Sequence, residues 1–266
     1  MPGAISDNSI PDIPSGELKE LLDRAFHEFN GTGFIPDDPV SVPHRFSRKE
    51  DIEVAGFFAA ILAWGNRKTI IRNTTRLLAL MDNDPHAFIL DFEEKDLKPF
   101  TRFVHRTFNG DDCIFFLHSL QKIYREEGSL EKVFTGTTPG QEAKEAIIHF
   151  RDVFFGPEHM QRTRKHIADP AKNASAKRIN MFLRWMVRKD DRGVDFGIWN
   201  GLRPSMLMCP LDIHTGNVSR KLGLLRRKQD DWKAVEELTA GLRRLDPADP
   251  VKYDIALFGL GANKRL

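Results

Sequence analysis

The chain has 266 residues, of which 41% are hydrophobic and 29% are charged, enough to form one sizeable core. Its 40 basic and 38 acidic residues nearly cancel to a net charge of +2, so the overall charge does not indicate a nucleic-acid binder, and any phosphate-binding surface must be a local patch. Its two cysteines, Cys113 and Cys209, are too few for a disulfide framework or a four-cysteine iron–sulfur cluster.

The sequence predicts neither a membrane-spanning helix nor a secretion signal. No stretch reaches the roughly 18 apolar residues that a membrane-spanning helix requires. The first residues lack the basic segment and apolar run of a secretion signal. The low cysteine content is typical of a reducing compartment. We therefore expect a cytoplasmic protein with no membrane partner.

Most of the chain carries apolar residues at steps of three and four, the spacing of amphipathic helices. Residues 1–16, rich in Pro, Gly and Ser, are predicted to be a flexible segment, and residues 30–44 an ordered loop. Helices are predicted over 17–29, 47–80 with an interruption at 64–66, 112–127, 139–154, 175–189, 213–224, 230–244 and 251–258. Because no alternating runs joined by hairpin turns occur, the expected fold class is all-α, a helical bundle.

The predicted helix over 175–189 contains a first candidate for chemistry. Its main apolar stripe, from Ile179 to Val187, is typical of a core-facing helix surface. Lys177, Met181 and Trp185 form a second strip at steps of four. A lysine that heads a mostly apolar strip can be partly removed from water, which increases its neutral, nucleophilic fraction. The plain alternative is an exposed lysine near the start of a helix.

A second candidate lies in the segment from Cys209 to His214. Pro210 keeps the chain extended before a predicted helix, and Asp212 is then well placed to accept a hydrogen bond from a backbone N–H in the first turn. Asp is among the commonest residues at such a cap. On composition alone, Asp212 therefore has the simpler interpretation of a helix cap.

Together the two segments resemble the helix-hairpin-helix DNA glycosylases. The matching residues are Lys177, the Pro-Leu-Asp-Ile-His run of 210–214 and the Arg-Lys-Leu-Gly run of 220–223. Residues 253–261 are similar to the last core helix of that superfamily, and residues 59–69 to its helix–turn that meets DNA. Lys177 and Asp212 lie 35 positions apart, a long separation that resembles that of the archaeal 8-oxoguanine DNA glycosylases. The whole chain also resembles a family of bacterial conserved hypothetical proteins.

The chain departs from the superfamily pattern in two places. The Leu-Pro-Gly-x-Gly hairpin is absent, and residues 168–177 stand in its place, so the usual contact of that hairpin with phosphate is not expected. A long insert at 190–209 must also be accommodated. Lys172 lies within the altered hairpin and remains an alternative to Lys177 as the nucleophile.

The resemblance implies a two-lobed helical domain over 17–266, with the active site between the lobes. It implies base excision from double-stranded DNA that contains a damaged base, here an oxidised purine, by a monomer. Lys177 would attack the anomeric carbon of a flipped nucleotide and form a Schiff base, and Asp212 would stabilise the cationic sugar. Strand cleavage by elimination could follow. The chemistry requires neither a metal nor another cofactor.

The same resemblance suggests which residues hold the DNA. Aromatic side chains should stack on the flipped base, and the candidates are Trp64, Phe182 and Trp199. The alternative is that all three belong to the core, a reading that suits Phe182 better than Trp64, which lies at a Gly-Asn turn. The expected DNA contacts are Asn66, Arg67, Lys68, Lys172, Arg178, His214 and Arg220. For any single basic residue, the alternative is a solvated surface position.

Three other functions are consistent with the sequence. The same fold could recognise DNA lesions without cutting, with Lys177 and Asp212 merely structural. A metal-dependent hydrolase could use some of the nine histidines, although no His-x-x-x-His pairing occurs. A helical scaffold for other proteins is the third possibility. The polar and aromatic segment 102–112 could be structural or could face DNA.

Overall fold

The computed structural model describes residues 15–136, 142–263 and 265. Within these residues the chain forms α-helices, short 3-10 helices and turns, with no β-strand, so the fold is all-α. The flexible segment predicted for residues 1–16 lies outside the described residues except for Ser15 and Gly16, which form the first turn of a helix. No helix in the described part of the chain is both long and apolar enough to cross a membrane.

Turns, short 3-10 helices and a few longer segments join the α-helices. They are α1 (Ser15–Phe29), α2 (Lys49–Ile61), α3 (Arg67–Ala79), α4 (Pro85–Asp91), α5 (Gly110–Glu126), α6 (Leu130–Thr135), α7 (Ala143–Phe154), α8 (Lys177–Val187), α9 (Ile213–Lys221), α10 (Trp232–Leu245) and α11 (Tyr253–Ala262). The 3-10 helices are η1 (Thr32–Asp37), η2 (Pro39–Ser41), η3 (Pro43–Arg45), η4 (Glu94–Arg102), η5 (Gln161–His166), η6 (Pro170–Lys172), η7 (Pro204–Met206) and η8 (Pro250–Lys252).

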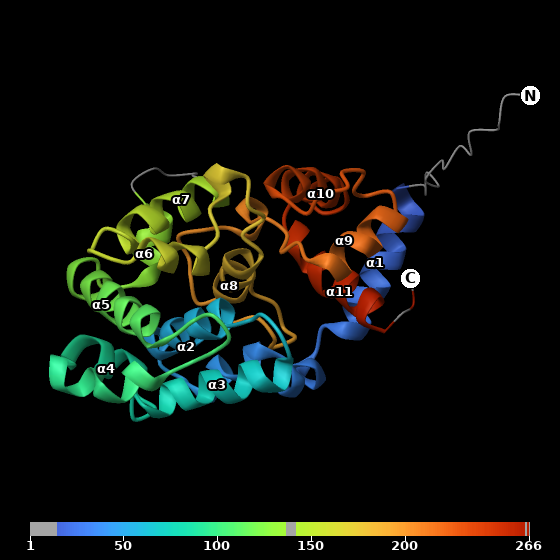
Figure 1. The fold of residues 1–266 in the computed structure, drawn as a ribbon. Helices are drawn as coiled ribbons and strands as arrows, with labels where there is room; N and C mark the ends of the chain where they lie inside the picture. The colour runs from blue at the N-terminus through green and yellow to red at the C-terminus, as the bar shows by residue number, and fades with distance from the viewer. Residues whose placement is uncertain (1–14, 137–141, 264, 266) are drawn as a thin grey trace, which may run out of the picture.

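The first and last helices pack against each other. Figure 1 shows α1, α9 and α11 side by side at one end of the molecule, with α4 and α5 at the other end and α8 between them. Helix α11 packs against both α1 and α9, and α8 packs against α2. The first and last helices therefore belong to one packed group, and α8 lies at its boundary with the rest.

The predicted long helix over 47–80 is interrupted where the sequence indicates. Gly65 adopts a φ of +110°, which an L side chain rarely adopts, and the Asn66 side chain accepts a hydrogen bond of 3.2 Å from Thr69 N–H to begin α3. Helices α6 and η4 were not predicted. Both are short, and α6 begins at the Ser129 cap, within a stretch too brief for a periodic signal.

An aromatic cluster fills the core around α2, α5, α7 and α8. The Phe57 ring lies 5.8 Å from Phe182 and 5.7 Å from Phe150, and the Phe182 ring lies 5.4 Å from Trp199. Buried Glu53 accepts a hydrogen bond of 2.8 Å from Trp199 Nε1. Phe182 and Trp199 are only 0% and 2% exposed, so their assignment to a base pocket is wrong: both face the apolar core.

Candidate functional site

A pocket of about 460 Å³ opens between α8 and α11. Lys177, Met181 and Arg184 lie at steps of four and three on one face of α8 and line one side of it. Asp254 and Phe258 line the facing side from α11, one turn apart. The predicted strip on α8 thus continues through Arg184, while Trp185 is fully buried.

Lys177 and Asp212 meet at the more exposed end of this pocket. Lys177 is the first residue of α8, and Asp212 is the N-cap of α9, where its Oδ1 accepts a hydrogen bond of 3.0 Å from Thr215 N–H. The Lys177 Nζ lies 3.3 Å from Asp212 Oδ2, and their side chains are 31% and 24% exposed. Asp212 is therefore a cap and an ion-pair partner at the same time.

The electrostatics of Asp212 follow from these contacts. Burial raises the pKa of Asp212, but the charge of Lys177 and the hydrogen bond from Thr215 N–H outweigh it. The resulting pKa lies below the ordinary value of 3.8, so the carboxyl group is ionised at neutral pH. A fixed negative charge beside an amine is the arrangement needed to stabilise a developing cation.

Two further carboxyl groups line the deeper part of the pocket. Asp254 is 7% exposed and accepts a hydrogen bond from Arg184 Nη1 at one oxygen. Asp38, 9% exposed, accepts a hydrogen bond of 3.0 Å from Val40 N–H at one oxygen. Within the described ranges, the second oxygen of each carboxyl has no hydrogen-bond donor, which leaves both available to a ligand in the pocket.

Burial raises the pKa of Asp254 to about 6. The charge of Arg184 opposes this effect, Asp212 adds to it, and Lys177 opposes it. Burial likewise raises the pKa of Asp38, against the hydrogen bond from Val40 and the charges of Arg67 and Arg184. The deep end of the pocket thus holds one carboxyl group, that of Asp254, that can gain or lose a proton near pH 6, beside Asp38, whose pKa is raised.

Aromatic rings form the apolar wall of the pocket. Phe34 and Phe258 both line it, and their ring centroids lie 6.3 Å apart in an edge-to-face arrangement. The Arg67 guanidinium lies 4.7 Å from the Phe258 ring, and the His214 ring lies 6.3 Å from it. The predicted residues Arg67 and His214 therefore reach the pocket, while Phe182 and Trp199, which were predicted to stack on the base, do not line it.

Residues 38–263 match the model of the DUF2400 family, whose description is "Protein of unknown function". The chain belongs to this family. No curated protein and no solved structure matches it. The family match covers the whole pocket except Phe34, because Asp38, Lys177, Asp212, Asp254 and Phe258 all lie within it.

The DUF2400 chain places the alternative nucleophile Lys172 away from the pocket. Lys172 ends η6 and is exposed, and the pocket lining does not include it. The following Asn173 adopts a left-handed conformation, and its side chain donates a hydrogen bond of 2.9 Å to Asp231, the cap of α10. The segment that replaces the predicted hairpin therefore docks on α10, and only Lys177 meets Asp212.

Trp64 adjoins the pocket without lining it. The guanidiniums of Arg106 and Arg178 lie 4.8 and 6.0 Å from the ring centroid, while the neighbouring residues Ala63 and Gly65 line the pocket. Its Nε1 is buried and has no hydrogen-bond partner among the described residues. The base contact of Trp64 therefore stays a prediction: the ring adjoins the pocket close to two arginines but does not line it in this conformation.

The other predicted DNA contacts separate into two groups. Asn66, Arg67 and Lys68 begin α3 beside the pocket, and Lys68 is exposed. Arg178, in contrast, donates to the Ile61 carbonyl, and burial lowers its pKa to about 10. Arg220 is tied to Asp230 and to the Arg227 carbonyl. Arg178 and Arg220 are therefore committed to internal contacts, which a sequence pattern does not reveal.

Proposed function

We propose that this DUF2400 chain is a DNA glycosylase of the helix-hairpin-helix type that removes a damaged base through a covalent lysine intermediate. The observation that carries the proposal is the 3.3 Å approach of Lys177 Nζ to Asp212 at the exposed end of a pocket with aromatic and carboxylate walls. The resemblance of residues 210–214 and 220–223 to the superfamily motif supports it independently.

The reaction begins with a nucleotide turned out of the duplex, because the anomeric carbon is out of reach inside the stack. The unprotonated Lys177 amine attacks that carbon, and the bond between carbon and base breaks with its electron pair going to the base, which takes up a proton. Asp212, ionised 3.3 Å away, stabilises the positive charge that develops on the sugar. Opening of the sugar ring then converts the lysine adduct into a Schiff base.

The walls of the pocket suit a flipped base. Phe258 and Phe34 offer rings for stacking. The free oxygens of Asp38 and Asp254 can accept hydrogen bonds from ring or exocyclic N–H groups, which an oxidised purine presents. A base held by these side chains would lie close to Lys177, because Lys177 lines the same pocket.

The decisive experiment is borohydride trapping on duplexes that each carry one oxidised, deaminated or alkylated base, and on a duplex with one abasic site. Borohydride reduces a Schiff base to a stable covalent complex. We expect trapping by the wild type and none by Lys177→Gln, because the covalent step depends on one amine. The matched control is Lys172→Gln, which removes an exposed lysine five residues away and should trap as the wild type does.

Two results would overturn parts of this proposal. Trapping by Lys177→Gln but not by Lys172→Gln would reassign the nucleophile. Tight binding of a lesion duplex with neither trapping nor base release would reject catalysis, and would favour a lesion-recognition protein in which Lys177 and Asp212 form only a structural ion pair.

A further inference from the structure

The segment that joins α8 to α9 contributes a buried carboxylate, Asp195, which contacts the pocket-lining residue Arg184. Its first part docks on the end of α8, where Phe196 N–H and Trp199 N–H donate to the carbonyls of Trp185 and Met186 at 2.8 and 2.9 Å. These bonds satisfy carbonyls that the end of a helix leaves free. The docking brings Asp195 next to α8, with its side chain 0% exposed.

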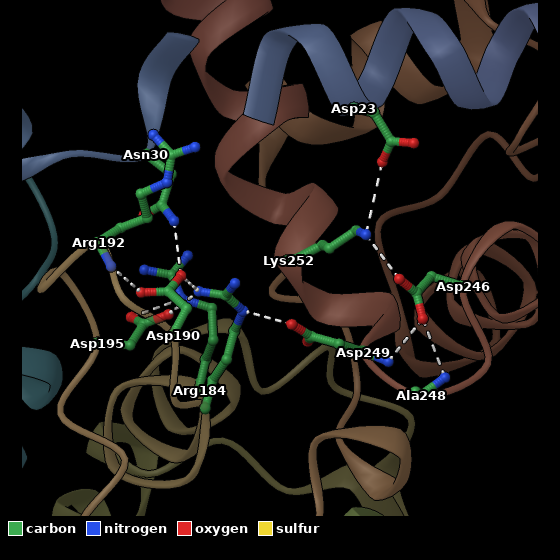
Figure 2. A network of polar contacts seen from close by, with 11 residues as sticks. Asp23, Asn30, Arg184, Asp190, Arg192, Asp195, Asp246, Ala248, Asp249 and Lys252 are labelled. Atoms are coloured by element: carbon green, nitrogen blue, oxygen red, sulfur yellow. Dashed lines mark hydrogen bonds and ion pairs between the residues drawn. The ribbon is translucent and has the colours of Figure 1, made fainter. Parts of the chain in front are cut away.

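Asp195 binds two arginines of α8 and its continuation. Its Oδ1 accepts a hydrogen bond of 3.2 Å from Arg184 Nε, and its Oδ2 accepts one of 3.1 Å from Arg188 Nη1. The Nη1 of Arg184 donates a hydrogen bond to Asp254, which lines the pocket. Figure 2 shows Arg184 and Asp195 in this network. The chain of contacts from Asp195 through Arg184 to Asp254 therefore ends at the pocket.

Arg188 anchors the same network on the side away from the pocket. It contacts Asp190 at 2.6 Å and Asp249 at 2.8 Å, and Asp190 accepts a hydrogen bond of 2.7 Å from Asn30 at the end of α1. Figure 2 shows Asn30, Asp190 and Asp249 in this network. Asp195 pairs with both Arg184 and Arg188, whereas Asp190 pairs with Arg188 and not with Arg184 among the described residues.

A buried guanidinium keeps one orientation only if its N–H groups are paired, because an unpaired charged donor in the interior is costly. Burial lowers the pKa of Arg184, but the charges of Asp195 and Asp254 raise it above its ordinary value, so Arg184 remains charged. Without Asp195, Arg184 Nε would lose its acceptor, and the guanidinium could turn toward the pocket or away from Asp254.

We propose that Asp195 is a positioning residue of the pocket: it holds Arg184 against Asp254 and so fixes the surface on which the base rests. This inference rests on the proposed glycosylase function. It assigns to the 190–209 insert a direct part in the site, although among the pocket-lining residues none comes from that insert. Asp195 lies outside the pocket lining and acts on the base through Arg184 and Asp254.

The test compares Asp195→Ala, Asp195→Asn and the matched control Asp190→Asn. In single-turnover base release from the lesion duplex that the wild type processes, we expect Asp195→Ala to slow release on the order of 10–100-fold, the usual cost of a misplaced substrate. Trapping on the abasic duplex should be unchanged, because no base occupies the pocket. Asp195→Asn keeps an oxygen for Arg184 Nε and should recover part of the rate.

Asp190→Asn should lower the melting temperature as the Asp195 variants do, because it also weakens a buried contact of Arg188, but it should release base at the wild-type rate. Equal loss of rate in Asp190→Asn and Asp195→Ala, or an equal loss of abasic trapping and base release in Asp195→Ala, would overturn the positioning role. Wild-type release by Asp195→Ala would overturn it as well.

A measurement without DNA separates this inference from the proposed function. If the wild type neither releases a base nor traps on abasic DNA, the glycosylase proposal fails, and hydrogen exchange of Arg184 Nε–H still tests the positioning. We expect slow exchange in the wild type and in Asp190→Asn, and fast exchange in Asp195→Ala, as observed by NMR. Slow exchange in Asp195→Ala would show that Arg184 is held without Asp195.

Discussion

The Nζ of Lys177 lies 3.3 Å from the Oδ2 of Asp212, although the two residues belong to different helices and are 35 residues apart in the chain. Asp212 also caps α9 through its other oxygen. The Asp212 side chain thus caps a helix, which stabilises the fold, and we propose that it also stabilises the sugar cation during the reaction. Suitable substitutions can separate the two.

Asp212→Asn should retain the cap and lose the charge. Asn is as good an N-cap as Asp, so the free energy of unfolding should change little, whereas Asp212→Ala should lose roughly 0.5–2 kcal/mol. Both variants should slow base release by about 100-fold or more, because the carboxylate that stabilises the sugar cation is gone. Chemical denaturation and single-turnover assays measure the two effects. Base release by Asp212→Asn at the wild-type rate would show that Asp212 acts only as the cap of α9.

The parts of this site that the sequence predicts are local ones. Asp212 could be predicted as a cap because Pro210 precedes it and an apolar-periodic helix follows, all within a few residues. The helix break at Gly65 is local in the same sense. The pairing of Lys177 with Asp212 was inferred only from a resemblance, since no periodicity relates residues on two helices.

The deep part of the pocket could not be predicted in this way. Arg184 and Asp254 are 70 positions apart and meet only because the fold brings α8 and α11 to the same pocket. Aromatic residues were equally ambiguous: Phe182 lies in the core and Phe258 lines the pocket, yet both occupy apolar helices. Burial of an apolar ring stabilises the protein in either place, so the sequence pattern does not distinguish core from pocket.

Asp254 should make stability depend on pH between about 4 and 6. Burial, opposed by Arg184, raises its pKa to about 6 from the ordinary 3.8. In this window the folded state therefore holds a proton that the unfolded state has released. The contribution of Asp254 to stability should fall as the pH rises from 4 to 6, and should be lost above 6.

Asp254→Asn has no carboxyl group to titrate at this position. As the pH rises from 4 to 6, the unfolding free energy of the wild type should therefore fall relative to that of Asp254→Asn. Urea titrations at several pH values measure the difference. A difference that stays constant from pH 4 to 7 would show that Asp254 keeps an ordinary pKa in the folded protein.

Gly259 should resist substitution by alanine. An added Cβ at this position of α11 would lie 2.2 Å from the Cδ2 and 2.4 Å from the Cγ of Phe29, at the end of α1. A helical Gly→Ala change normally stabilises by roughly 0.5–1 kcal/mol, but the clash should reverse the sign and cost about 1–3 kcal/mol. The control is Gly16→Ala in α1, where nothing lies within 4 Å. Thermal unfolding should show a lower melting temperature for Gly259→Ala alone.

DNA binding should depend on the start of α3 despite the near-neutral net charge of the chain. Arg67 lines the pocket beside Phe258, and Lys68 is exposed next to it, so both can meet phosphates of a duplex whose flipped base enters the pocket. Each cation that contacts a phosphate releases a counterion, which makes the affinity fall steeply with salt.

Arg67→Gln and Lys68→Gln should therefore each weaken binding to a duplex with one abasic site. Each should also reduce the slope of log affinity against log salt by about 1. The matched control is Lys122→Gln on α5, an exposed lysine at the opposite end of the molecule, and it should change neither quantity. Fluorescence anisotropy at several salt concentrations measures both. Equal effects of all three substitutions would indicate diffuse attraction and no binding face at α3, while wild-type affinity in both α3 variants would place the DNA elsewhere on the surface.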